Sequence, residues 1–176
     1  MKNSVTLGFI GALSGILSFI IANYYQDLEY TAGVVFGLFI GLYFIGFWHH
    51  TAHPVKIFLW ICTSVVGYYI AVSYVTGLFT KDNQTTFFIA GFLGAGVMLA
   101  GFSTFLSRLT WRQYMVLVIF GGVLGLTWFL GDSKPRVFAG SSPFPPALAW
   151  LYVCWQTGMA FGIGYCLDIN KKSNVA

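Results

Sequence analysis

Charged residues are scarce in this chain of 176 residues, of which only 8% are Asp, Glu, Lys or Arg. A soluble domain carries roughly 25% charged residues, so this chain has too few to cover a surface that faces water. The shortage excludes a soluble globular protein. The chain has instead 57% hydrophobic and 19% aromatic residues, in continuous rather than alternating runs, which disfavours a β-barrel. The composition predicts an all-α integral membrane protein.

Paired cysteines and clustered basic residues are also missing. Cys62, Cys154 and Cys166 all lie in apolar runs, where buried free thiols are expected rather than a disulfide framework. The Lys and Arg residues give a formal net charge of +4 but are scattered along the connections, so we expect no nucleic-acid partner. The sequence predicts the lipid bilayer as the partner of this chain, and it predicts no cofactor.

Six segments are long and apolar enough for helices that cross the hydrocarbon, for which roughly 20 residues are needed. The first of them exceeds the ~7–15-residue apolar core of a signal peptide, so we expect it to be retained. We therefore predict a single transmembrane domain over residues 1–176. The predicted spans are Val5–Tyr25, Tyr30–Phe47, Val55–Phe79, Thr86–Leu106, Tyr114–Leu130 and Pro146–Leu167.

The basic residues in the short connections predict the orientation, because cytoplasmic connections carry an excess of Lys and Arg. Cytoplasmic N- and C-termini place most of the basic residues inside. That arrangement predicts a multi-pass protein of the cell membrane, and in particular of a bacterial inner membrane. The inner set is Lys2, Lys56, Arg108, Arg112, Lys171 and Lys172, and the outer set is Lys81, Lys134 and Arg136.

An internal similarity divides the chain into a first half, residues 1–83, and a second half, residues 84–176. Since each half holds three predicted spans, the second half enters the bilayer from the opposite side, as in a 3+3 inverted repeat. The matching positions are Gly8–Ala12 with Gly91–Ala95, Phe36-Gly37 with Phe120-Gly121, Gly41-Leu42 with Gly125-Leu126, and Pro54 and Cys62 with Pro146 and Cys154.

Rows of small residues at spacings of three and four recur in most of the predicted helices. In lipid, such rows let helix backbones approach closely, so they predict contacts between helices. The clearest are Gly8, Gly11 and Gly15, then Gly33, Gly37 and Gly41, then Gly91 and Gly94, Gly121 and Gly125, and Gly158 and Gly162.

A few neutral polar residues are predicted near the middle of the bilayer, where no acidic or basic residue falls. Gln156 is the most informative, because an unpaired amide in hydrocarbon costs several kcal/mol and needs a partner or a cavity. One interpretation is a hydrogen bond between helices, and the other is contact with a substrate or with water. The candidate path residues are Gln156, Thr157, Ser64, Thr63 and Trp155.

Two polar groups lie nearer the predicted membrane surfaces. His49, His50 and His53 are compatible with an interfacial loop, a pH-sensitive gate, or a metal or haem site, although Pro54 disfavours helix at His53. Asp27 and Glu29 are compatible with a solvated turn or with an outer mouth that attracts cations.

The leading functional hypothesis is a transporter or channel-like protein with a neutral polar site between the two inverted halves. One alternative is a non-catalytic membrane subunit, or an immunity or assembly factor, that binds a membrane-protein partner or a second copy of the chain. Another is an intramembrane metal or haem enzyme that uses the His49–His53 cluster. The absence of a recognisable catalytic arrangement favours a protein that is not an enzyme.

Overall fold

The computed structural model describes residues 2–24, 31–46, 53–78, 84–127 and 146–173, and the described residues contain six α-helices and no strand. Each predicted apolar segment corresponds to one helix. Their bounds are α1 Asn3–Tyr24, α2 Thr31–Gly46, α3 Pro54–Leu78, α4 Gln84–Phe105, α5 Trp111–Gly125 and α7 Pro146–Ser173.

Three of these helices are long and apolar enough to cross a membrane, namely the segments Asn3–Ala22 of α1, Pro54–Tyr74 of α3 and Gln84–Phe105 of α4. The described parts of α2 and α5 are equally apolar in character but shorter, at 16 and 15 residues. At 1.5 Å per residue they extend about 24 and 22 Å. The structure therefore describes an all-helical protein with three helices compatible with membrane spans by length and composition.

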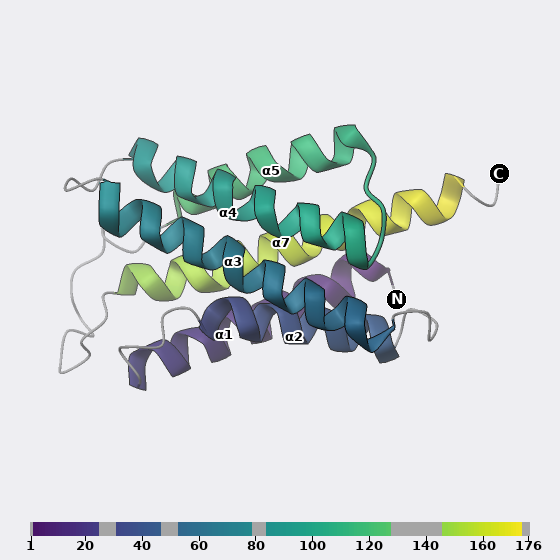
Figure 1. Ribbon diagram of the computed structural model, residues 1–176, viewed down its shortest axis with the longest axis horizontal. Coiled ribbons are helices and arrows are strands. Elements are labelled where there is room, and N and C mark those ends of the chain that lie inside the picture. The colour runs from purple at the N-terminus through teal and green to yellow at the C-terminus, as the bar shows by residue number, and fades with distance from the viewer. Residues whose placement is uncertain (1, 25–30, 47–52, 79–83, 128–145, 174–176) are drawn as a thin grey trace.

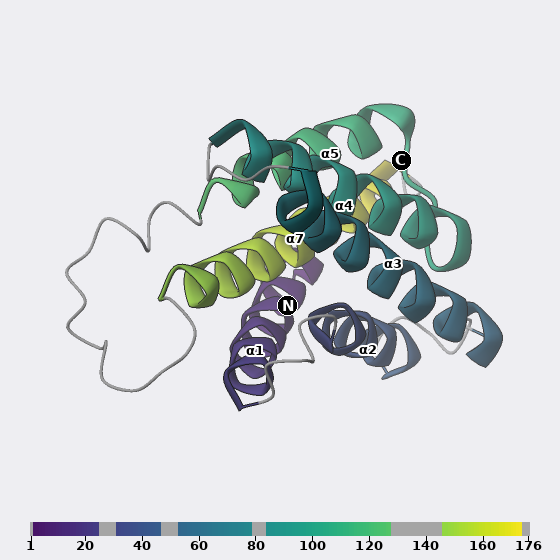
Figure 2. The same ribbon diagram turned by 60° about the vertical axis from the view of Figure 1, so that its left-hand side comes forward.

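Successive helices run in alternating directions along the long axis of the bundle, and both ends of the chain lie at the same end of it (Figure 1). Each helix packs against the next one in the sequence, and α7 returns to pack against α1 (Figure 2). The six helices thus form a closed ring in chain order. The α1–α7 pair, which joins the beginning of the chain to its end, has the most extensive contact in the ring.

Large apolar side chains fill the centre of the ring. Phe36, Trp60 and Phe102 are completely buried, and their rings meet edge-on or tilted at centroid distances of 5.7 Å for Trp60–Phe102 and 6.5 Å for Phe36–Trp60. Many apolar residues elsewhere, including Phe9 and Phe58, are exposed on the outside of the bundle. An apolar exterior around an apolar interior is the pattern expected of a bundle surrounded by lipid.

The predicted rows of small residues lie at the helix contacts. A Cβ atom on Gly11 would stand 2.4 Å from the carbonyl oxygen of Gln156 in α7, and one on Gly91 would stand 2.4 Å from the carbonyl oxygen of Gly121 in α5. The Gly33, Gly37 and Gly41 row faces α3 in the same way. Only glycine permits such close approach, so these rows fix which helix faces meet.

Most helix ends differ from the sequence prediction by one or two residues, and those of α5 and α7 differ by more: α5 ends at Gly125 rather than Leu130, with a turn at residues 126–127. Helix α5 begins at Trp111 rather than Tyr114, because Thr110 and Gln113 form a reciprocal capping box that satisfies free backbone N–H groups. Helix α7 continues past Leu167 to Ser173, although polar residues follow Leu167. The prediction ended the span where the apolar run ends, whereas the helix itself continues and carries Asp168 with it.

The two prolines that the internal similarity pairs have the same structural position. Pro54 is the first residue of α3, and Pro146 is the first residue of α7. A first helical position suits proline, because the missing N–H would lack a helical partner there in any case.

Two tryptophans make similar hydrogen bonds between neighbouring helices. The indole N–H of Trp60 in α3 donates to the carbonyl oxygen of Gly37 in α2 at 2.9 Å, and the indole N–H of Trp155 in α7 donates to that of Gly121 in α5 at 3.1 Å. The acceptors are the two glycines that the internal similarity aligns, whereas the two donor tryptophans are three positions out of register in that alignment.

Candidate functional site

Gln156 lies at the centre of a buried polar cluster between α1 and α7. Its amide oxygen accepts a hydrogen bond from the Ser14 hydroxyl, and its amide nitrogen donates to the Ser18 hydroxyl at 3.1 Å. All three side chains are completely buried. Ser14 and Ser18 are four residues apart, which places both on one face of α1, so a single amide can contact both.

The close approach of α1 and α7 brings these groups within reach of one another. Gly11 lies against the Gln156 carbonyl, and Gly15 lies against the backbone of Tyr152 and Val153. With a larger residue at either position the two helices would separate, and the short serine side chains would no longer reach the amide. The small-residue row therefore positions the cluster as well as packing the helices.

Two hydroxyl groups beside this cluster have no hydrogen-bond partner among the described residues. The Tyr68 hydroxyl, on α3, is buried and faces the side chains of Gln156 and Tyr152. The Thr157 hydroxyl, next to Gln156 on α7, is also buried. A buried hydroxyl without a partner costs free energy, so these two groups are free to bind a polar molecule that reaches them.

An aromatic wall borders the cluster. The ring of Trp155 meets the ring of Tyr68 edge-on at a centroid distance of 5.3 Å and that of Phe36 at 6.1 Å. Since the Trp155 indole N–H is bonded to the Gly121 carbonyl, Trp155 offers the site an apolar ring face rather than a donor.

The other two candidate path residues lie at different helix contacts. The Ser64 hydroxyl donates to the Gly33 carbonyl oxygen at 2.9 Å, across the α2–α3 contact. The Thr63 hydroxyl donates to the Trp60 carbonyl oxygen of its own helix at 2.8 Å, and its side chain lies against Gly101 of α4. Both hydroxyls have backbone partners, whereas those of Tyr68 and Thr157 have none.

The histidine cluster is described only at its last member. His53 is exposed immediately before α3, and its ring nitrogen Nδ1 accepts from the backbone N–H of Val55 at 3.4 Å. His49 and His50 lie outside the described residues, as do Asp27 and Glu29 of the predicted outer mouth. Within the part of the chain that is described, no group of three His, Cys, Asp or Glu residues is placed to hold a metal ion.

A second polar cluster joins the beginning of α1 to the end of α7. The Asp168 carboxylate accepts four hydrogen bonds of 2.8–3.0 Å from the backbone and side-chain groups of Asn3 and Ser4. The Tyr43 hydroxyl of α2 donates to the Asn3 side chain at 2.7 Å. Burial raises the pKa of Asp168, but the hydrogen bonds from Ser4 and Asn3 outweigh it and hold that pKa below its ordinary value.

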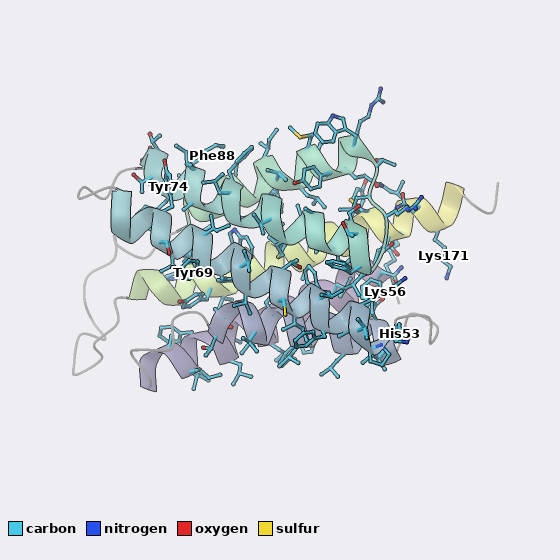
Figure 3. The ribbon with its side chains drawn as sticks, in the orientation of Figure 1. His53, Lys56, Tyr69, Tyr74, Phe88 and Lys171 are labelled. Atoms are coloured by element: carbon cyan, nitrogen blue, oxygen red, sulfur yellow. The ribbon has the colours of Figure 1, made fainter. Side chains whose placement is uncertain are left out.

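The described basic side chains gather at the end of the bundle that holds this second cluster. Figure 3 shows Lys56 and Lys171 together with His53 at that end, while Tyr74 lies at the opposite end. Arg108, in the turn between α4 and α5, is held there because its carbonyl oxygen accepts from the Asn170 side chain of α7. We refer to this part of the molecule as the basic end.

Sequence reasoning identified Gln156 but missed its partners. Ser14 and Ser18 were not proposed as its partners, and Tyr68 and Asp168 were not considered. The spacing of Ser14 and Ser18 was a usable signal, since two hydroxyls four residues apart in an apolar helix share a face. Nothing local indicates Tyr68, because its position depends on how α3 and α7 pack. The chain matches no protein-family model, no curated protein and no solved structure.

Proposed function

We propose that this protein is a six-span membrane protein that binds a small neutral polar solute at the Gln156 cluster and lets it pass between two inverted halves. The observation that carries the proposal is the pair of buried hydroxyls, Tyr68 and Thr157, that lack partners beside an amide already fixed by two serines. Such groups supply a donor and an acceptor at a place that is otherwise apolar.

The arrangement of the helices supports the six-span topology. Each predicted span corresponds to a helix, directions alternate, and both chain ends lie at the basic end (Figure 1). That end also carries Lys56, Arg108, Arg112 and Lys171, as cytoplasmic placement requires. The apolar exterior of the bundle is compatible with lipid on all sides.

The order of the helices is compatible with the inverted repeat, because exchanging α1 with α4, α2 with α5 and α3 with α7 converts each contact of the closed ring into another. Every closed ring of six helices in chain order has this property, so the specific support comes from matched residues. The Trp60–Gly37 and Trp155–Gly121 hydrogen bonds form one such exchanged pair. The Gln156 cluster combines α1 and α3 of the first half with α7 of the second, which is where inverted repeats place their binding sites.

The chemistry of the cluster selects the class of solute. Every charged side chain that the structure describes belongs to the basic end, and the groups around Gln156 are amide, hydroxyl and aromatic. A charged solute would lack a counter-ion there, and its desolvation would be costly. A small alcohol, an amide or water matches the donor and acceptor groups.

Solute flux into vesicles that contain the purified protein tests the proposal. Tyr68→Phe removes only the hydroxyl that lacks a partner, so the fold is retained. If that hydroxyl contacts the solute, the flux of glycerol or urea falls severalfold. If the cluster only holds helices together, flux is unchanged and thermal stability is equal or higher, because a buried unsatisfied group has been removed.

A matched pair of threonine variants shows whether a change in flux is specific to the Gln156 cluster or follows from the loss of any buried hydroxyl. Thr157→Val removes the second unpartnered hydroxyl, and Thr86→Val replaces a buried threonine of α4 that lies outside the cluster and has interactions of its own. Lower flux for Thr157→Val alone supports the site. Equal flux for wild type, Tyr68→Phe, Thr157→Val and Gln156→Leu would contradict it.

The alternative of a non-catalytic membrane subunit has a weaker basis. Its predicted docking surfaces were the rows of small residues and the outer connection over residues 131–145. The rows on α1, α2 and α4 face other helices of the same chain, and the connection lies outside the described residues. Purification in a mild detergent distinguishes the two functions, because a subunit retains a stoichiometric partner and a solute pathway does not need one.

A further inference from the structure

An open groove lies on the outside of the bundle where α4 turns into α5, at the basic end. Its floor is formed by small side chains of α4, and its sides by the turn and by aromatic residues of α5. The lining residues are Ala100, Ser103, Thr104, Leu109, Trp111 and Tyr114. This groove is distant in the sequence and separate in the structure from the groups that surround Gln156.

The aromatic side of the groove has the character of a membrane interface. Trp111 is 72% exposed, and its ring stacks on that of Tyr114 at a centroid distance of 5.8 Å and an interplanar angle of 15°. The Tyr114 hydroxyl is bonded to the Gly96 carbonyl, whereas the Trp111 indole N–H has no partner among the described residues. Such amphipathic rings are favoured at the level of lipid headgroups.

Two arginines adjoin lining residues of the groove in the sequence and have no acidic partner among the described residues. Arg108 lies in the turn and Arg112 follows Trp111 on α5, and both are exposed. Neither side chain forms an ion pair or hydrogen bond with the described residues. Asp168, the one acidic residue in the described ranges, already accepts four hydrogen bonds from Asn3 and Ser4. The positive charge beside the groove is therefore uncompensated within the described chain.

The hydroxyl groups of the floor are already engaged. Thr104 donates to the Ala100 carbonyl at 2.7 Å, and the Ser103 oxygen accepts from the Leu109 N–H at 3.1 Å. The floor therefore presents mainly carbon atoms to whatever lies in the groove. An apolar floor, an indole N–H and two exposed arginines next in sequence to Leu109 and Trp111 match a molecule that has a hydrocarbon chain and an anionic head.

We propose that this groove binds an anionic phospholipid of the cytoplasmic leaflet, with the phosphate between Arg108 and Arg112 and an acyl chain against Ala100 and Trp111. Basic sites on the cytoplasmic face of helical membrane proteins bind such headgroups. The inference requires that the bundle lies in a membrane, but it does not depend on solute passage at Gln156. Lipid binding in the groove can therefore be measured even if no solute passes at Gln156, and solute flux can be measured even if the groove binds no lipid.

The test uses the full-length protein in phosphatidylcholine vesicles with increasing amounts of phosphatidylglycerol brominated on its acyl chains. Bromine quenches tryptophan fluorescence on contact, and the difference between wild type and Trp111→Phe isolates the signal of Trp111. Arg108→Gln with Arg112→Gln should raise the phosphatidylglycerol fraction for half-quenching by about fivefold for each charge removed. Both arginines are exposed, so the fold is expected to be unaffected.

A matched control removes the same charge elsewhere at the basic end. Lys56→Gln with Lys171→Gln should leave half-quenching within about twofold of wild type. If both double variants weakened phosphatidylglycerol binding equally, only the overall charge of the basic end would matter. That result would overturn the proposed lipid site in the groove. Brominated phosphatidylcholine that quenches Trp111 as effectively as brominated phosphatidylglycerol would overturn it too, because the groove would then accept any lipid.

Discussion

The side-chain amide of Asn3 donates a hydrogen bond of 2.8 Å to the carboxylate of Asp168, although 165 positions separate the two residues. The contact joins the first turn of α1 to the last part of α7, so it closes the ring of helices at one end. A carboxylate that receives the free N–H groups of a helix beginning acts as a cap. In this protein the cap comes from the other end of the chain.

Removing this cap should destabilise the bundle. Asp168→Ala leaves the backbone N–H groups of Asn3 and Ser4 without their acceptor, and we expect a loss of about 2 kcal/mol in the free energy of unfolding. Denaturant unfolding in detergent micelles measures it. Lys171→Ala, an exposed change near the same end of α7, is the control, and an equal loss in both variants would contradict the role of Asp168.

The same carboxylate predicts a pH dependence. Its pKa in the folded protein is held below the ordinary value of 3.8 by the hydrogen bonds from Ser4 and Asn3, which outweigh its burial. Its contribution is therefore fully present above pH 3.8 and is lost as pH falls through the lower folded pKa. The stability difference between wild type and Asp168→Asn should be constant from neutral pH down to that value and then shrink. A difference that shrinks already near neutral pH would show that another group is responsible.

Two glycines of α4 provide a test of close helix packing. A Cβ on Gly91 would lie 2.4 Å from the Gly121 carbonyl oxygen, whereas one on Gly96 would lie 3.7 Å from its nearest neighbour. Gly91→Ala should cost about 1–3 kcal/mol through displacement of α5. Gly96→Ala should cost nothing, because alanine favours the helix. Thermal melting of both variants measures this difference in stability. Equal melting temperatures would refute the close contact at Gly91.

The paired tryptophans test the relationship between the two halves. Trp60→Phe and Trp155→Phe each remove one indole-to-carbonyl hydrogen bond, and each should cost about 1 kcal/mol plus a smaller packing loss. Related halves predict similar costs that add in the double variant within about 0.5 kcal/mol. Trp111→Phe, on the exposed surface, is the control for the change of ring. A large cost at one position and none at the other would argue against equivalent roles.

The proposed topology predicts the side on which each connection lies. Reporter enzymes fused after residue 83 should be active outside the cell, and those fused after residue 108 or residue 176 should be active only in the cytoplasm. The physical reason is that three, four and six spans then precede the reporter, while the basic residues stay inside. Activity outside the cell for the fusion after residue 176 would mean an odd number of spans, which would contradict the inverted repeat.

The sequence by itself determined the helical class, the positions of the six helices and the surfaces through which they pack. Apolar runs and glycine spacing are local properties, and they predict helices and close contacts without knowledge of the fold. The helix bounds were displaced where a local signal was overlooked, as with the capping box of Thr110 and Gln113, where a helix continued past its apolar run, as at Asp168, and where α5 ended at Gly125 within an apolar run.

The tertiary structure decided which helices are neighbours and therefore which polar groups meet. Ser14 and Gln156 are 142 positions apart, and Tyr68 lies beside the same amide although it belongs to a third helix. The rows of small residues show which face of each helix packs but not which helix it packs against, because every helix is apolar and carries a similar row. Only the tertiary contact of Gly11 and its neighbours with the backbone of α7 places the hydroxyls of α1 around Gln156.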